Sequence, residues 1–164
     1  MFKLDSKKIE YIYATALSPS DCTTILKLLP NLKGFGIDQA LGPVLSSCID
    51  NDDDLNRFMN IIEFGDLFTN STTLDLLVKY CPKVNRISLE SPERNVIVYL
   101  SKFSLLTDIK IFTDNFDEVM NLIKIIGWQI KKLNLHTDSH EFDPNLLREL
   151  CPKLVILEIN FDRF

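Results

Sequence analysis

The 164-residue sequence predicts a single α/β domain spanning residues 1–164, a curved right-handed solenoid in which parallel strands alternate with helices. Three observations predict this fold: a recurring motif, a recurring apolar spacing, and residues that start and stop helices between the copies. The motif is a helix end, then Cys-Pro-Lys, then a strand, and it occurs at residues 76–89 and 147–159. A unit repeated along a chain is typical of stacked repeat folds.

The recurring spacing places apolar residues at the first, fourth and sixth positions of a six-residue segment. The first apolar residue enters a strand, and the other two face the same side because strand side chains alternate. Six copies begin at Ile9, Leu32, Val84, Leu106, Ile130 and Leu154, and they lie 22 to 24 residues apart except for one gap of 52. In that gap we place a seventh copy at Leu55, with a register beginning at Phe58 as the alternative. The sequence therefore predicts six or seven repeats.

Helix signals separate the copies. Residues 18–21, Ser-Pro-Ser-Asp, can satisfy the free N–H groups of a first helical turn, as can Asp143 followed by Pro144. A further short helix is predicted over residues 39–49. Proline cannot continue helical hydrogen bonding, and it falls two residues before the spacing in three copies, at Pro30, Pro82 and Pro152. We therefore expect one helix for each strand.

The predicted curvature follows from the packing distances of the two layers. Strands lie ~4.8 Å apart and packed helices ~8–10 Å apart, so the helical layer must form the longer arc. The parallel sheet is therefore expected on the concave face and the helices on the convex face.

The segments Cys81–Leu89 and Cys151–Ile159 resemble the cysteine-containing leucine-rich repeats of F-box/leucine-rich-repeat proteins, which have a ribonuclease-inhibitor-like fold. The resemblance covers nearly the whole chain and rests on a structural motif. It implies a protein-binding module, and it suggests the substrate-recognition part of an F-box-like ubiquitin-ligase receptor. The chain departs from that pattern because a first repeat at Ile9 leaves no room for an F-box. The family's loop cysteine or asparagine is also replaced, at Ser91, Thr113, Thr137 and Phe161.

Composition narrows the classes of partner. A net charge of −5 argues against nucleic-acid binding and against a polybasic membrane-surface module. The N-terminus lacks the apolar run of a signal peptide, and no apolar stretch approaches ~18 residues. The four cysteines form no close pair, so we interpret them as reduced, buried small hydrophobes. We expect a cytoplasmic or nuclear protein that binds neither nucleic acid nor membranes.

No motif in the sequence indicates catalysis. Residues 136–143 gather both histidines, His136 and His140, with acidic residues, but they follow a predicted strand as a solvated loop. Residues 51–54, Asn-Asp-Asp-Asp, lack the alternating ligands and closing glutamate of a calcium loop. No nucleophile triad or glycine-rich phosphate loop can be assembled. We expect no enzymatic activity, no metal and no cofactor.

The candidate site is the concave face, formed by the strand residues that alternate with the core positions. Aromatic side chains such as Tyr11, Tyr13 and Phe112 are large for a face that is otherwise polar, and aromatics and arginines anchor many protein interfaces. The predicted partner-binding residues are Tyr11, Tyr13, Arg57, Met59, Arg86, Ser88, Glu90, Asp108, Lys110, Phe112, Lys132, Asn134, His136, Ile156 and Glu158.

The size of this face limits what it binds. Seven strands with five residues each cover roughly 500 Å², whereas a standard interface takes ~800 Å² from each partner. We therefore expect a protein partner that inserts a peptide or loop. The alternative is a structural or self-associating solenoid without a separate ligand, which would use an apolar C-terminal end face around Leu154, Leu157, Ile159 and Phe161.

Overall fold

The structure is a computed structural model that describes residues 6–14, 17–37, 58–67, 71–90, 92, 94–113, 115–137 and 143–161. Several predictions lie outside these residues: the helix over residues 39–49, the acidic run at 51–54, Leu55, Arg57 and His140.

In the described part of the chain, seven strands form one sheet in chain order, and every neighbouring pair is parallel. The strands are β1 (Tyr11–Ala14), β2 (Gly34–Ile37), β3 (Glu63–Leu67), β4 (Arg86–Glu90), β5 (Asp108–Phe112), β6 (Lys132–His136) and β7 (Ile156–Asn160). The described α-helices are α1 (Pro19–Leu28), α4 (Ser71–Tyr80), α5 (Arg94–Leu100), α6 (Phe116–Ile126) and α7 (Pro144–Leu150). Two 3₁₀ turns, η1 (Ser6–Lys8) and η2 (Gly127–Gln129), complete the described elements.

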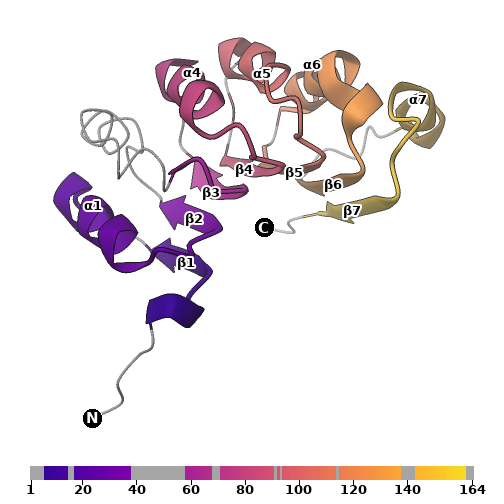
Figure 1. The fold of residues 1–164 in the computed structure, drawn as a ribbon. Helices are drawn as coiled ribbons and strands as arrows, with labels where there is room; N and C mark the ends of the chain where they lie inside the picture. The colour runs from indigo at the N-terminus through magenta and orange to yellow at the C-terminus, as the bar shows by residue number, and fades with distance from the viewer. Residues whose placement is uncertain are drawn as a thin grey trace.

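The α-helices lie together on one face of the sheet (Figure 1). The predicted α/β class with a parallel sheet is thereby confirmed. The predicted helix starts at Ser18 and Asp143 are also confirmed, since Asp21 N–H donates to Ser18 Oγ at 3.2 Å and Asn145 N–H donates to Asp143 Oδ1 at 2.9 Å. Among the described elements, no helix covers the other face of the sheet, which we call the open face (Figure 1).

The unit that enters each strand is built in the same way seven times. A backbone N–H donates to the carbonyl three residues earlier at 3.0 to 3.4 Å, with donors at Ile9, Leu32, Ile61, Val84, Leu106, Ile130 and Leu154. The carbonyl of the next residue then accepts from two consecutive N–H groups of the following unit, at Glu10, Lys33, Ile62, Asn85, Thr107 and Lys131. The backbone therefore steps from unit to unit in one constant register.

The third unit begins at Ile61, so its predicted start at Leu55 and the alternative start at Phe58 are wrong. Met59 lies in the turn before β3 and not on the open face, so its predicted place among the strand residues of that face is wrong as well. Ile61 and Phe64 are fully buried in the places that the motif reserves for its first two apolar residues.

A shift in strand pairing explains the error. The pairing of β3 with β4 is regular from Glu63 to Phe64, but Leu67 then pairs with Leu89, one residue later than the regular count. The extra residue is a β-bulge, and it removes the third apolar residue from its expected place. Because the bulge breaks the six-residue spacing, the true start at Ile61 did not match the motif, and the prediction placed the start at Leu55 instead.

The core lies between the sheet and the helices. It contains inward strand residues such as Ile87 and Leu89, and helix residues such as Leu77. Cys81 and Cys151 are buried free thiols at the helix ends, and burial raises the pKa of both. Both fit the interpretation of small core residues. None of the helices in the described part of the chain has the length and apolar character needed to cross a membrane.

Candidate functional site: the open face of the sheet

The strand register arranges the outward side chains of the open face in rows. The first row runs across all seven strands as Tyr11, Gly34, Glu63, Arg86, Asp108, Lys132 and Ile156. Two residues further along β4 to β7, a middle row contains Ser88, Lys110, Asn134 and Glu158. Two residues beyond that, an outer row contains Glu90, Phe112, His136 and Asn160. All predicted site residues other than Arg57 and Met59 lie at these alternate strand positions.

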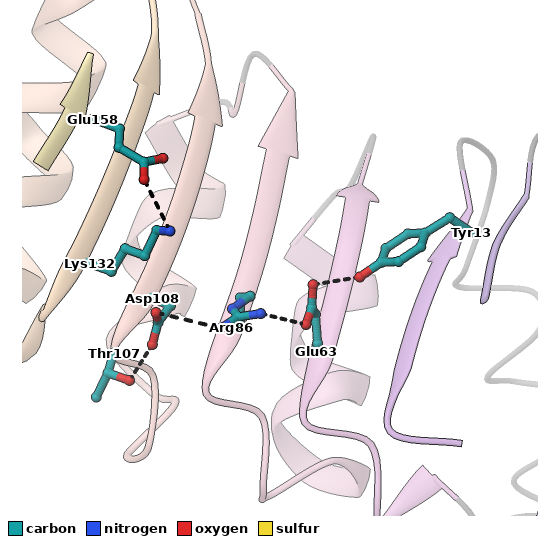
Figure 2. Close-up of polar contacts among 7 residues, drawn as sticks. All are labelled: Tyr13, Glu63, Arg86, Thr107, Asp108, Lys132 and Glu158. Carbon is teal, nitrogen blue, oxygen red and sulfur yellow. Dashed lines mark hydrogen bonds and ion pairs between the residues drawn. The ribbon is translucent and has the colours of Figure 1, made fainter. Parts of the chain in front are cut away.

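Glu63 is the residue of this face that the sequence prediction missed. Its carboxylate accepts a hydrogen bond from the Tyr13 hydroxyl at 2.5 Å and pairs with Arg86 Nη1 at 3.0 Å (Figure 2). One signal could have located it: the apolar pair Ile61 and Phe64 has the right spacing, and Glu63 lies between them. Glu63 therefore links the tyrosine end of the face to its charged centre.

Charges alternate along the centre of the first row. Glu63, Arg86, Asp108 and Lys132 lie on four successive strands. Arg86 Nη2 is 3.9 Å from Asp108 Oδ1, and Lys132 Nζ is 3.3 Å from Glu158 Oε1 (Figure 2). Opposite charges on neighbouring strands each contribute about 0.2–1 kcal/mol to the sheet. This arrangement holds the side chains in defined positions.

Thr107 and Asn134 add neutral hydrogen bonds to the charged centre. The Thr107 hydroxyl donates to Asp108 Oδ2 at 2.8 Å, and the amide of Asn134 donates to Glu158 (Figure 2 shows the first of these). The carboxylates of Asp108 and Glu158 therefore each have a second partner besides a cation. These contacts restrict the orientation of both carboxylates.

Tyrosine rings cover glycines at the N-terminal end of the face. A Cβ atom placed on Gly34 would lie 2.4 Å from Cδ1 of Tyr11, and one on Gly36 would lie 2.2 Å from Cδ1 of Tyr13. The Tyr13 ring extends further, because a Cβ atom on Gly65 would lie 2.8 Å from its Cε1. The rings therefore lie against the backbones of β2 and β3, where only glycine leaves room for them.

The phenol of Tyr13 is held in its neutral form. Partial burial against the sheet is the largest cause, and the hydrogen bond and negative charge of Glu63 add to it, so the pKa of Tyr13 is raised well above its usual value. Both tyrosine side chains still present about half of their surface to solvent, 44% for Tyr11 and 52% for Tyr13. They form an ordered aromatic platform with one accessible side.

A second aromatic group lies on the outer row. The rings of Phe112 and His136 stack with centroids 4.3 Å apart, and Lys110 Nζ is 4.4 Å from the centroid of Phe112. The His136 Nε2 atom is 3.3 Å from the amide nitrogen of Asn160. The histidine is thus engaged by an aromatic ring and an amide. In the part of the chain that the structure describes, no three histidine, cysteine or acidic residues are arranged to hold a metal ion.

Two of the cavities among the described residues lie at the sheet. One of about 170 Å³ lies over the centre of the open face and is lined by Arg86, Asp108, Ile109, Lys110, Lys132 and Asn134. The other, of about 560 Å³, lies where β1 to β3 begin and is lined by Glu10, Tyr11, Pro30, Asn31, Leu32, Lys33, Asn60 and Ile62. The first lies wholly among residues predicted for the site or next to them.

The last strand differs from the others in burial. Leu157 of β7 is 40% exposed, whereas Leu133, which pairs with it on β6, is 1% exposed. Val155, Ile156 and Phe161 are also exposed apolar residues near this end. The predicted apolar end face is therefore present among the described residues.

No protein-family model matches the sequence, and no curated protein sequence has detectable similarity to it.

Proposed function

We propose that this protein is a non-enzymatic interaction module of leucine-rich-repeat type, a curved solenoid that binds a peptide or loop of a partner protein on its open, concave face. The observation that carries the proposal is the open face itself. It presents a tyrosine platform at one end and the Phe112–His136 stack near the other, with a row of alternating charges between them.

The ordered side chains of this face favour binding. Tyr13 is held by Gly36, Gly65 and Glu63, so association would immobilise little further rotamer freedom. Aromatic side chains supply much contact area for few rotatable bonds. The paired charges contribute mainly to orientation and to the choice of partner, because each already has a counter-charge.

The cellular role that we propose with this module is the recognition of substrates for a ubiquitin ligase. The sequence motifs around Cys81 and Cys151 support it through their resemblance to F-box/leucine-rich-repeat proteins. Affinity purification of the chain from cells would test it. Recovery of a cullin-type ligase together with the bound partner is the expected result, and a partner recovered repeatedly without any ligase subunit would contradict it.

Selection of binding peptides tests the interaction module itself. A random peptide library displayed on phage would be selected on the immobilised chain, and the selected peptides measured against Tyr11→Ala and Phe112→Ala variants. Loss of an interface anchor costs more than ~1 kcal/mol, so we expect binding to weaken about fivefold or more. Trp128→Ala is the matched control, because Trp128 is an exposed aromatic residue in the turn after α6, outside the open face. Peptides that bind all variants equally would contradict the proposal.

The second candidate function, self-association, is favoured by the exposed end of the array. Leu157 and Phe161 are apolar and accessible there, and an exposed strand edge is a template for pairing with another chain. Sedimentation over a range of concentrations tests this candidate. We expect association that Leu157→Lys abolishes, and a monomer at every concentration would rule it out.

A further inference from the structure

The open face contains one cation whose charge no described carboxylate balances. Arg86 pairs with Glu63 and lies near Asp108, and Lys132 pairs with Glu158. Lys110 instead holds its ammonium group over the ring of Phe112, and among the described residues it makes no ion pair. In the middle row of the face, Lys110 at the centre of β5 therefore has no counter-charge among the described residues.

The cavity of about 170 Å³ opens at this position. Its lining includes the cations Arg86, Lys110 and Lys132, against the single carboxylate of Asp108, so its formal charge is positive. A cavity needs only ~10–15 Å³ to hold one water molecule, so this one can receive a side-chain group. Glu63 and Glu158 pair with Arg86 and Lys132 from outside the lining, so Lys110 is the cation of the cavity that makes no ion pair among the described residues.

We propose that this cavity binds the side-chain carboxylate of a glutamate or aspartate in an extended segment of the partner, an inference that rests on the proposed interaction function. The incoming carboxylate would pair with Lys110 and give it a counter-charge. It would also lie near Arg86 and Lys132, whose existing partners approach from neighbouring strands. The acidic residue fixes the register of the bound segment, while the aromatic groups on either side contact its neighbours.

The carboxylate of Asp108 makes the cavity favour a carboxylate over a phosphate. It lines the same cavity, so a phosphate carrying nearly two negative charges at neutral pH would be repelled by it more strongly than a carboxylate with one. Arg86 and Lys132 are already paired with Glu63 and Glu158, so Lys110 is the cation left to pair with an incoming anion. One negative charge therefore matches it better than two.

Short capped peptides test the cavity without any knowledge of the natural partner. Gly-Glu-Gly, Gly-Gln-Gly and Gly-phosphoserine-Gly would be titrated into the isotopically labelled protein, and backbone amide shifts followed by NMR. With the glutamate peptide we expect saturable shifts centred on Lys110 and its neighbours in β4 and β6. The glutamine peptide should bind about fivefold more weakly or not at all, as expected when an ion pair worth up to ~1 kcal/mol is lost.

Variants of the protein provide the control for charge. Lys110→Gln should weaken binding of the glutamate peptide about two- to fivefold, the range for a solvent-accessible ion pair. Lys79→Gln is the matched control, because Lys79 also lies over an aromatic ring, that of Tyr80, at 4.8 Å, but belongs to α4 on the other side of the sheet. It should leave binding unchanged. Lys110→Glu should reverse the preference and favour a Gly-Lys-Gly peptide.

Three results would overturn the inference. They are the absence of saturable shifts with the glutamate peptide, equal binding of the glutamate and glutamine peptides, and tighter binding of the phosphoserine peptide. These are distinguishable from a failure of the proposed function. If selected peptides bind the open face but their affinity does not change when acidic residues are replaced by amides, the module stands and the carboxylate site falls. If no peptide is selected at all, the module falls.

Discussion

The two copies of the Cys-Pro motif show what position in the array does to the same local sequence. In both, the helix ends at a buried cysteine, Cys81 or Cys151, and the turn closes with the same backbone hydrogen bond. In the strand that follows, however, Ile87 is fully buried while the corresponding Leu157 is 40% exposed. The motif thus sets the local structure, but the burial of the strand residue that follows depends on the position of the unit in the array.

The difference arises because each unit is covered by the next one along the chain. Strand β4 pairs with β3 on one side and with β5 on the other, whereas β7 pairs only with β6 among the described strands. In repeat arrays, stability is approximately a sum of unit and nearest-neighbour terms. Among the described units, the one that contains β7 therefore has one neighbour term fewer than a central unit, and it should open before the central units do.

Alanine substitutions at equivalent positions should show the largest effect. Ile87→Ala removes fully buried methyl groups and should lower the free energy of unfolding by about 2–5 kcal/mol. Leu157→Ala should lower it by less than about 1 kcal/mol, because the side chain already contacts water. Urea unfolding of both variants measures this difference. Equal losses of unfolding free energy would mean that the core side of β7 is buried to the same degree as that of β4.

A methyl group at Gly127 should disturb the packing between the last two described units. A Cβ atom there would lie 2.7 Å from the carbonyl oxygen of Leu150 and 2.8 Å from Sγ of Cys151. Both atoms belong to the end of α7, so Gly127→Ala should lower the free energy of unfolding by about 1–3 kcal/mol through overpacking. Gly127→Ala together with Cys151→Ala tests the cause, since removal of the sulfur relieves one contact and should restore part of the loss. If the double variant is no more stable than Gly127→Ala, the contact with the carbonyl oxygen of Leu150 alone accounts for the loss.

The smallest of the three expected effects is a difference in reactivity between the thiols of Cys81 and Cys151. Burial raises the pKa of both Cys81 and Cys151, so each reacts with a thiol reagent only after the structure opens locally. Because the terminal unit opens more easily, we expect Cys151 to be modified about tenfold faster, a difference of ~1.4 kcal/mol in opening. Mass spectrometry of the labelled wild-type protein measures both rates together. Faster labelling of Cys81 would contradict the model of end opening.

Much of the fold could be predicted from the sequence because its signals are short in range. Capping at Ser18 and Asp143 and the recurrent apolar spacing each depend on residues within one turn or one strand. They placed six of the seven units in the register that the backbone hydrogen bonds show. The prediction failed at the third unit because the bulge after Phe64 is a property of strand pairing, and it breaks the apolar spacing on which the prediction relied.

The arrangement of the candidate site depended much more on tertiary structure. The sequence identified Tyr13 and Arg86 as outward residues, but their connection through Glu63 depends on the register of β3. The glycines Gly36 and Gly65 are 29 residues apart in the sequence, and only strand pairing brings both beneath one tyrosine ring. Contacts across strands are long in range, so no local pattern could have predicted them.

The sequence by itself determined the alternation of helix and strand, the parallel sheet, and which side chains point away from the helices. Those properties follow from the periodicity of side chains and from capping, which act within a few residues. Tertiary structure decided where Glu63 lies, how the tyrosines are held, and why Lys110 at the cavity makes no ion pair with a described residue while Lys132 pairs with Glu158. Each of these depends on the distances between side chains on different strands, and such distances exist only once the sheet has formed.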